Sequence, residues 1–134
     1  MIDTLTRHQP NALALLRVVT GLLFLHHGTQ KLFSLPPLPE GMQGMLGPLF
    51  WPAGILEVVG GVLIIIGLFT RPVAFLLSGM MAVAYFLAHA SQNFYPALNG
   101  GDASILFSFV FLYLVFAGPG AFSVDAARRA PAYA

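Results

Sequence analysis

Residues 51–69 read Trp51-Pro-Ala-Gly-Ile-Leu-Glu-Val-Val-Gly-Gly-Val-Leu-Ile-Ile-Ile-Gly-Leu-Phe69, an apolar run interrupted by a single charged residue, Glu57. An α-helix needs about 20 predominantly apolar residues to cross a bilayer. A carboxylate at the centre of such a helix costs about 2.5–3.5 kcal/mol on insertion scales, so it usually faces the bundle interior and has a partner there. The stretch therefore predicts a membrane-spanning helix with a candidate site at Glu57.

The composition of the whole chain agrees with this local pattern. Hydrophobic residues make up 57% of the 134 residues and charged residues 8%, with a mean hydropathy of +0.81. Soluble domains carry about 25% charged residues, so the lipid bilayer is the expected solvent and partner. The net charge of +1 comes without a basic run, which excludes a nucleic-acid partner. The absence of cysteine excludes disulfides, thiolate nucleophiles and iron–sulfur ligation by this chain alone.

Four apolar stretches predict an all-α membrane protein with a bundle of four transmembrane helices in a single domain, residues 1–134. The predicted spans are about 12–33, 51–69, 72–90 and 103–118. Thr70-Arg71-Pro72 predicts a tight hairpin between the second and third spans, because proline suits a helix start. The fourth span is expected to begin with Asp102 as an N-cap-type acid and to end at Gly118-Pro-Gly120. Ser123 is expected to cap a short helix that ends near Arg129.

The cations predict the orientation of the bundle. Arg7, Arg71, Arg128 and Arg129 fall on the side shared by both termini and the turn at 70–72, so that side is predicted to be cytoplasmic. The Pro-rich loop 34–50 is then periplasmic, with its Leu and Met residues, Phe50 and Trp51 as candidates for the membrane interface. Arg17 lies inside the cytoplasmic end of the first span and is expected to snorkel to the headgroups.

One end of the bundle gathers the titratable residues. With a rise of 1.5 Å per residue, Glu57 and His27 both lie about 9 Å inside the outer end of their spans. The predicted outer polar pocket consists of His26, His27, Lys31, Glu57, His89 and Asp102. We expect Glu57 to be coupled to Lys31 across the first two spans, either as half of a structural ion pair or as a proton-handling or ligand-binding group. Adjacent histidines point about 100° apart, so we predict no metal site, and the sequence leaves open whether His26 or His27 faces inward.

Small residues recur on the faces that carry these polar groups. Glycines let helix backbones approach closely in membranes. The glycines predicted to pack helices together are Gly21, Gly28, Gly60, Gly61 and Gly67.

Four motifs in order carry a family resemblance. They are Arg17-Val-Val-Thr-Gly-Leu-Leu-Phe-Leu-His-His-Gly-Thr-Gln-Lys-Leu-Phe33, Gly54-Ile-Leu-Glu-Val-Val-Gly-Gly-Val-Leu-Ile-Ile-Ile-Gly-Leu-Phe-Thr-Arg71, Asn99-Gly-Gly-Asp102 and Gly118-Pro-Gly-Ala-Phe-Ser-Val-Asp125. Together they cover nearly all of the chain and resemble the DoxX family. Asp102 departs from the family pattern, in which a glutamate is more usual.

The resemblance implies a small multi-pass protein of the bacterial inner membrane. The family that the chain resembles is related to membrane subunits of thiosulfate:quinone oxidoreductase and to partners of secreted antioxidant enzymes. The resemblance therefore implies that the protein is a membrane subunit or partner of a quinone-linked oxidoreductase. That enzyme would act in thiosulfate or sulfur metabolism or in oxidative stress. No cofactor is built into the chain, but a quinone is a candidate ligand.

Two alternatives remain open at this stage. The chain could be a non-catalytic protein that assembles or recruits a secreted or peripheral enzyme on the periplasmic side. Transport of a small solute is the less favoured reading, because four short spans without evident repeats leave little room for alternating access in a monomer. A homo-oligomer would relax that restriction.

Overall fold

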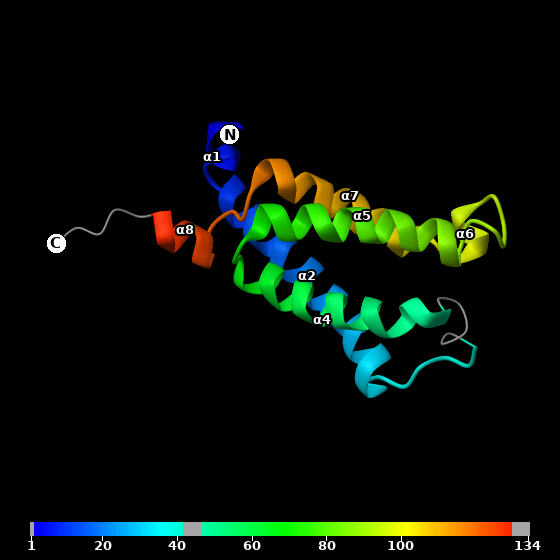
Figure 1. The fold of residues 1–134 in the computed structure, drawn as a ribbon. Helices are drawn as coiled ribbons and strands as arrows, with labels where there is room; N and C mark the ends of the chain where they lie inside the picture. Colours follow the sequence, from blue (N-terminus) through cyan, green and yellow to red (C-terminus); the bar gives the residue numbers. More distant parts are fainter. Residues whose placement is uncertain (1, 42–46, 130–134) are drawn as a thin grey trace.

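The computed structural model describes residues 2–41 and 47–129, and these contain helices without any strand. The central part of the loop predicted at 34–50 lies outside the described residues. In chain order the elements are α1 (Ile2–Arg7), α2 (Gln9–Phe33), the 3-10 turn η1 (Gly47–Leu49), α4 (Phe50–Ile66), α5 (Thr70–Ala88), α6 (Pro96–Asn99), α7 (Asp102–Ala117) and α8 (Val124–Arg129) (Figure 1).

Among the described residues, three segments are long and apolar enough to cross a membrane: α2, η1 with α4 (Gly47–Ile66), and α5. They correspond to the first three predicted spans. The fourth predicted span is α7, which is apolar but has only 16 residues. At 1.5 Å per residue such a helix is about 24 Å long, somewhat short of a hydrocarbon core of about 30 Å.

The four long helices form two pairs. α2 packs mainly against α4, and α5 packs mainly against α7, whereas contacts between the pairs are fewer. Figure 1 shows α7 running beside α5, α2 crossing α4 obliquely, and a short turn joining α4 to α5. That turn is tight as predicted, with Gly67 at a φ of 67° and Phe69 at 52°. The two helices that it joins nevertheless have their main packing partners elsewhere.

Glycines allow the close contact between α2 and α4. A Cβ added to Gly28 would lie 2.7 Å from the backbone nitrogen of Val58, and one on Gly61 would lie 3.0 Å from Cα of Leu25. Gly60 instead faces α5, where a Cβ would lie 2.8 Å from Cδ2 of Leu77. The backbone contact at Gly28 leaves no room for a methyl group and the one at Gly61 is tight, so these glycines set the separation of α2 and α4, whereas Gly60 meets only the end of a flexible side chain.

We expect Gly28→Ala to lower the free energy of unfolding by about 1–3 kcal/mol, because the added methyl meets backbone atoms that cannot move aside. Gly79→Ala is the matched control, since a Cβ there meets nothing within 4 Å. The control should be neutral or stabilising by up to about 1 kcal/mol, because alanine favours helix more than glycine does. Thermal melting of the purified protein in mild detergent measures both effects. Equal melting temperatures for the two variants would contradict the close contact.

The outer surface of the bundle is apolar, as a lipid-facing surface requires. Phe75, Phe86 and Phe116 are exposed to 70%, 70% and 74%, and many Leu, Ile and Val side chains are exposed with them. An apolar surface of this extent on a soluble monomer would promote association. The buried core is small and lies where the two pairs meet; it contains Phe24, Ile64, Ala74, Leu77, Met81, Phe111 and Leu114.

Arg17 does not snorkel, and that expectation was wrong. Its side chain is wholly buried and donates hydrogen bonds to the main-chain carbonyls of Pro119, Ala121 and Phe122, with a longer one of 3.5 Å to Ile65. Where the chain turns back after α7, its main-chain carbonyls find few hydrogen-bond donors in an apolar bundle. The guanidinium of Arg17 has five N–H donors and provides the missing hydrogen bonds. Arg17 therefore attaches the 118–122 turn to α2 and to the end of α4.

Two more polar groups join helix ends at the same end of the bundle, where α1 and α8 also lie (Figure 1). Arg71 donates to the carbonyls of Val115 and Phe116 at the end of α7, at 2.5 and 2.8 Å. Asp125 accepts hydrogen bonds from the backbone N–H groups of Phe69 and Thr70, at 2.9 and 2.8 Å. Although partial burial acts to raise it, the pKa of Asp125 is lowered overall by these hydrogen bonds and by the charge of Arg129.

Ser123 caps α8 as predicted. Its Oγ accepts a hydrogen bond of 3.1 Å from the N–H of Ala126, and α8 ends at Arg129. This capping satisfies one of the free N–H groups at the start of the helix.

Candidate functional site

A cavity of about 200 Å³ lies between the two helix pairs. All four long helices contribute to its wall, together with His89 and Gly100 from the segment between α5 and α7. Most of the lining is apolar, and a few polar side chains converge on it, which is the usual composition of a small-molecule site. The lining residues are Phe24, His27, Lys31, Phe50, Glu57, Met81, Ala84, Ala88, His89, Gly100, Ala103, Ser104 and Phe107.

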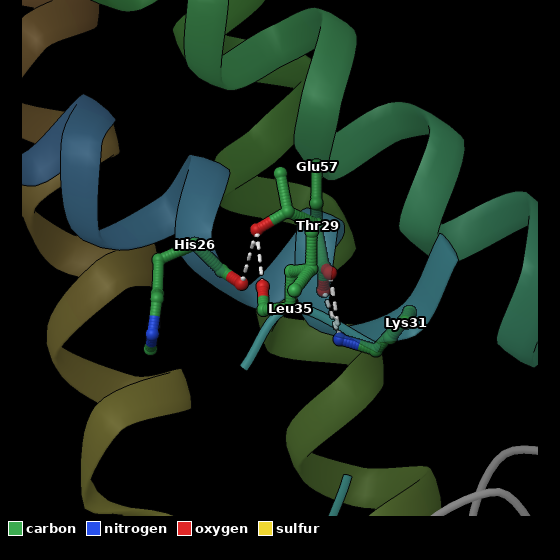
Figure 2. A network of polar contacts seen from close by, with 5 residues as sticks. All are labelled: His26, Thr29, Lys31, Leu35 and Glu57. Atoms are coloured by element: carbon green, nitrogen blue, oxygen red, sulfur yellow. Dashed lines mark hydrogen bonds and ion pairs between the residues drawn. The ribbon is translucent and has the colours of Figure 1, made fainter. Parts of the chain in front are cut away.

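Lys31 and Glu57 form an ion pair in the cavity wall. Nζ of Lys31 lies 2.8 Å from Oε1 and 2.6 Å from Oε2 of Glu57, so one ammonium group contacts both carboxylate oxygens (Figure 2). Their side chains are exposed to 10% and 4%. The contact links α2 to α4, and it leaves one of the three ammonium hydrogens for another acceptor.

The end of α2 holds Lys31 in place. The chain leaves the helix at Ser34, which has a φ of 54° and whose N–H donates to the carbonyl of Gln30. The Thr29 hydroxyl contacts the carbonyls of His26 and Leu35, at 3.0 and 2.8 Å (Figure 2). A cation in the last turn is also favoured by the negative end of the helix dipole.

The two adjacent histidines face different surroundings. His27 lines the cavity, and its ring packs edge-on against that of Phe107, with centroids 5.8 Å apart. His26 is exposed and does not line the cavity. His27 is thus the inward-facing member of the pair. Within residues 2–41 and 47–129 no group of three or more His, Cys, Asp or Glu side chains is arranged to hold a metal ion.

Asn99 organises one end of the cavity through contacts that the sequence alone does not show. Its amide nitrogen donates to the carbonyl of Asn93 at 2.9 Å and to the Tyr85 hydroxyl at 3.3 Å. Its amide oxygen accepts from the N–H of Gly101 at 2.8 Å, and its main-chain carbonyl lies 2.9 Å from Nδ1 of His89. All polar groups of a buried amide side chain are therefore occupied, which fixes the loop over the cavity.

Asp102 lies outside this arrangement. It is the first residue of α7, it is exposed, and the cavity wall does not include it. The expectation that it is the N-cap was wrong, because Gly101 occupies that position. A Cβ on Gly101 would lie 2.5 Å from Cε2 of Tyr85, so the ring of Tyr85 requires glycine there. Asp102 still suits the first turn, where a negative charge interacts favourably with the helix dipole.

The long apolar helices, the apolar exterior and the buried ion pair together define a multi-pass membrane protein with a small internal cavity. The sequence model of the DoxX family matches residues 12–90, which contain α2, α4, α5 and the Lys31–Glu57 pair. The chain belongs to the DoxX family.

Its relatives place it in the bacterial inner membrane. An uncharacterized protein of Haemophilus influenzae is 43% identical over 128 residues, covering 92% of this chain and 96% of the relative. The Escherichia coli inner membrane protein YqjF is 33% identical over 113 residues, or 81% and 85% of the two chains. The E. coli inner membrane protein YphA is 28% identical over 131 residues, or 87% and 90%. No solved structure matches the chain. The protein is a multi-pass inner-membrane protein.

Proposed function

We propose that the protein is the membrane subunit or partner of a quinone-linked oxidoreductase and binds the head group of a quinone between its helix pairs. The observation that carries the proposal is the cavity itself. It places the Lys31–Glu57 pair and two histidines against the aromatic side chains of Phe24, Phe50 and Phe107. Aromatic faces suit a planar ring, and the polar groups suit its two oxygen atoms.

The chemistry assigned to this chain is proton exchange. Reduction of a quinone to a quinol takes up two electrons and two protons, and oxidation of the quinol releases them. A partner protein supplies or receives the electrons, because the side chains that line the cavity include no redox-active group. The titratable groups in the cavity wall donate or accept the protons, for which His, Lys and Glu are suitable acids and bases.

Glu57→Gln should weaken the binding of a short-chain ubiquinone or menaquinone analogue to the purified protein by about tenfold or more, because Lys31 then loses its partner and its placement. Equilibrium titration in nanodiscs gives the affinity. His26→Gln is the matched control, since His26 is exposed outside the cavity, and it should leave the affinity unchanged. Absence of binding by the unaltered protein would reject the proposal. Binding that is unaffected by Glu57→Gln would place the quinone elsewhere.

We further propose four membrane spans with both termini in the cytoplasm, α7 being the fourth. The even number of spans and the cations Arg7, Arg71, Arg128 and Arg129 support this orientation. The cavity then opens nearer the periplasmic side, on which a protein partner would dock.

Cysteine labelling tests the orientation, because the chain has no cysteine of its own. Glu40→Cys, in the loop after α2, should react with a membrane-impermeant thiol reagent in spheroplasts. Ala127→Cys, on α8, should react only after the membrane is opened. Both positions are exposed, so burial does not confound the comparison. The reverse pattern would show that the termini are periplasmic.

A further inference from the structure

The neutral ring of His89 is held in one tautomer. Its Nδ1 lies 2.9 Å from the main-chain carbonyl oxygen of Asn99, and a carbonyl oxygen can only accept a hydrogen bond. Nδ1 therefore carries the hydrogen. In the neutral ring the other nitrogen, Nε2, is then without a hydrogen and acts as an acceptor. His89 lines the cavity, and Nε2 is the ring nitrogen that its contact with Asn99 leaves for a ligand there.

Four other polar side chains line the cavity: His27, Lys31, Glu57 and Ser104. Lys31 is a donor only, and two of its three hydrogens are directed at Glu57. Ser104 has a hydroxyl that can donate or accept. For His27, none of the hydrogen bonds found among the described residues fixes its tautomer, so its ring adapts to either partner. Lys31 is thus a fixed donor in the cavity wall, whereas His89 and the Glu57 carboxylate are fixed acceptors.

We infer that the cavity selects the reduced carrier, a quinol, over the quinone. A quinone presents two carbonyl oxygens, which are acceptors, and one of them would oppose the lone pair of His89 Nε2. A quinol can accept from Lys31 through one oxygen and donate its other hydroxyl hydrogen to Nε2. This inference rests on the proposed function and names the redox form that the site takes. His89 Nε2 accepts the hydrogen bond from the quinol hydroxyl, and Asn99 is a positioning residue.

The side chain of Asn99 makes this positioning possible. Its amide is bonded to Asn93, Tyr85 and Gly101, and Asn99 is only 5% exposed. Those contacts hold the main-chain carbonyl against His89. Tyr85 stacks on the ring of His89, with centroids 6.4 Å apart and an angle of 23°, and so restrains the ring plane.

Anaerobic titration of the purified protein in nanodiscs, with ubiquinol and ubiquinone carrying a one-unit isoprenoid tail, tests the inference. We expect the quinol to bind about tenfold more tightly than the quinone. The quinol gains a hydrogen bond to His89 Nε2 where the quinone meets a repulsive lone pair. His89→Asn is the informative variant, because its amide nitrogen can still donate to Asn99 while Nε2 is lost. It should bind both forms with affinities within about threefold of each other.

Nitrogen NMR of histidine-labelled protein provides a second measurement that does not depend on any ligand. At a pH where His89 is neutral, its signals should be those of the Nδ1–H tautomer, and Asn99→Ala should produce a mixture of tautomers. An Nε2–H tautomer, or a quinone that binds as tightly as the quinol, would overturn the inference and leave the proposed function intact. If neither form binds, both fail. If Asn99→Ala leaves the tautomer unchanged, Asn99 has no positioning role.

Discussion

Removing either Lys31 or Glu57 alone should lower the free energy of unfolding by about 3–5 kcal/mol, because the remaining charge is stranded in a buried wall. The suitable variants are Lys31→Met and Glu57→Gln, which keep most of the side-chain volume. The double variant should recover a large part of the loss, since two neutral groups leave no unpaired charge. Thermal unfolding in mild detergent, monitored by circular dichroism, measures the stability of the two single variants and of the double variant.

The control for this cycle is Glu40→Gln, which removes an exposed carboxylate from the loop after α2. It should change stability by less than about 0.5 kcal/mol, as surface substitutions usually do. Losses that simply add in the double variant would show that Lys31 and Glu57 are not coupled. A double variant that folds but no longer binds quinone would assign the pair to the function as well as to the fold.

Arg17→Met should destabilise the protein by at least about 3 kcal/mol, because several buried carbonyls lose their donor and each such loss costs about 1–3 kcal/mol. Arg17→Lys should recover only part of this, since a lysine cannot reach carbonyls of Pro119, Ala121 and Phe122 in the geometry of a guanidinium. Arg7→Met, which removes an exposed cation from α1, serves as the control and should have little effect. Melting in detergent again gives the comparison.

A second readout separates the local effect of Arg17 from a general loss of packing. Limited proteolysis of Arg17→Met should cut first in the segment 118–122, because its attachment to α2 is lost. Resistance of that segment, with a melting temperature equal to that of the Arg7→Met control, would contradict the role assigned to Arg17.

The sequence predicted the helices and the central contact well, for a physical reason. A single carboxylate in a run as apolar as 51–69 has few acceptable partners, and Lys31 is the cation at matching depth on another span. The glycines that approach a neighbouring helix were also visible, because small residues recur at helical spacing. Both features can be seen in short stretches of sequence, because burying an unpaired charge or a bulky side chain between packed helices costs free energy.

Three features were not predictable in this way. The grouping of α5 with α7 leaves little trace in the sequence, because the lipid-facing and the buried faces of these helices are both apolar. The role of Arg17 depends on carbonyls more than 100 residues further along the chain. The role of Asn99 depends on how the loop after α5 folds back over His89, and an asparagine before two glycines reads simply as a turn.

The order in which the chain is synthesised gives the helix pairing a further consequence. Lys31 and Glu57, which are 26 residues apart, belong to the pair that emerges first from the ribosome. That hairpin can enter the bilayer with its two opposite charges already neutralising each other, without waiting for the second hairpin. Arg17 is different, because most of its partners lie in the segment made after α7. The first hairpin can thus insert with its Lys31–Glu57 pair already formed, whereas the charge of Arg17 on the same hairpin gains most of its partners only after α7 has been made.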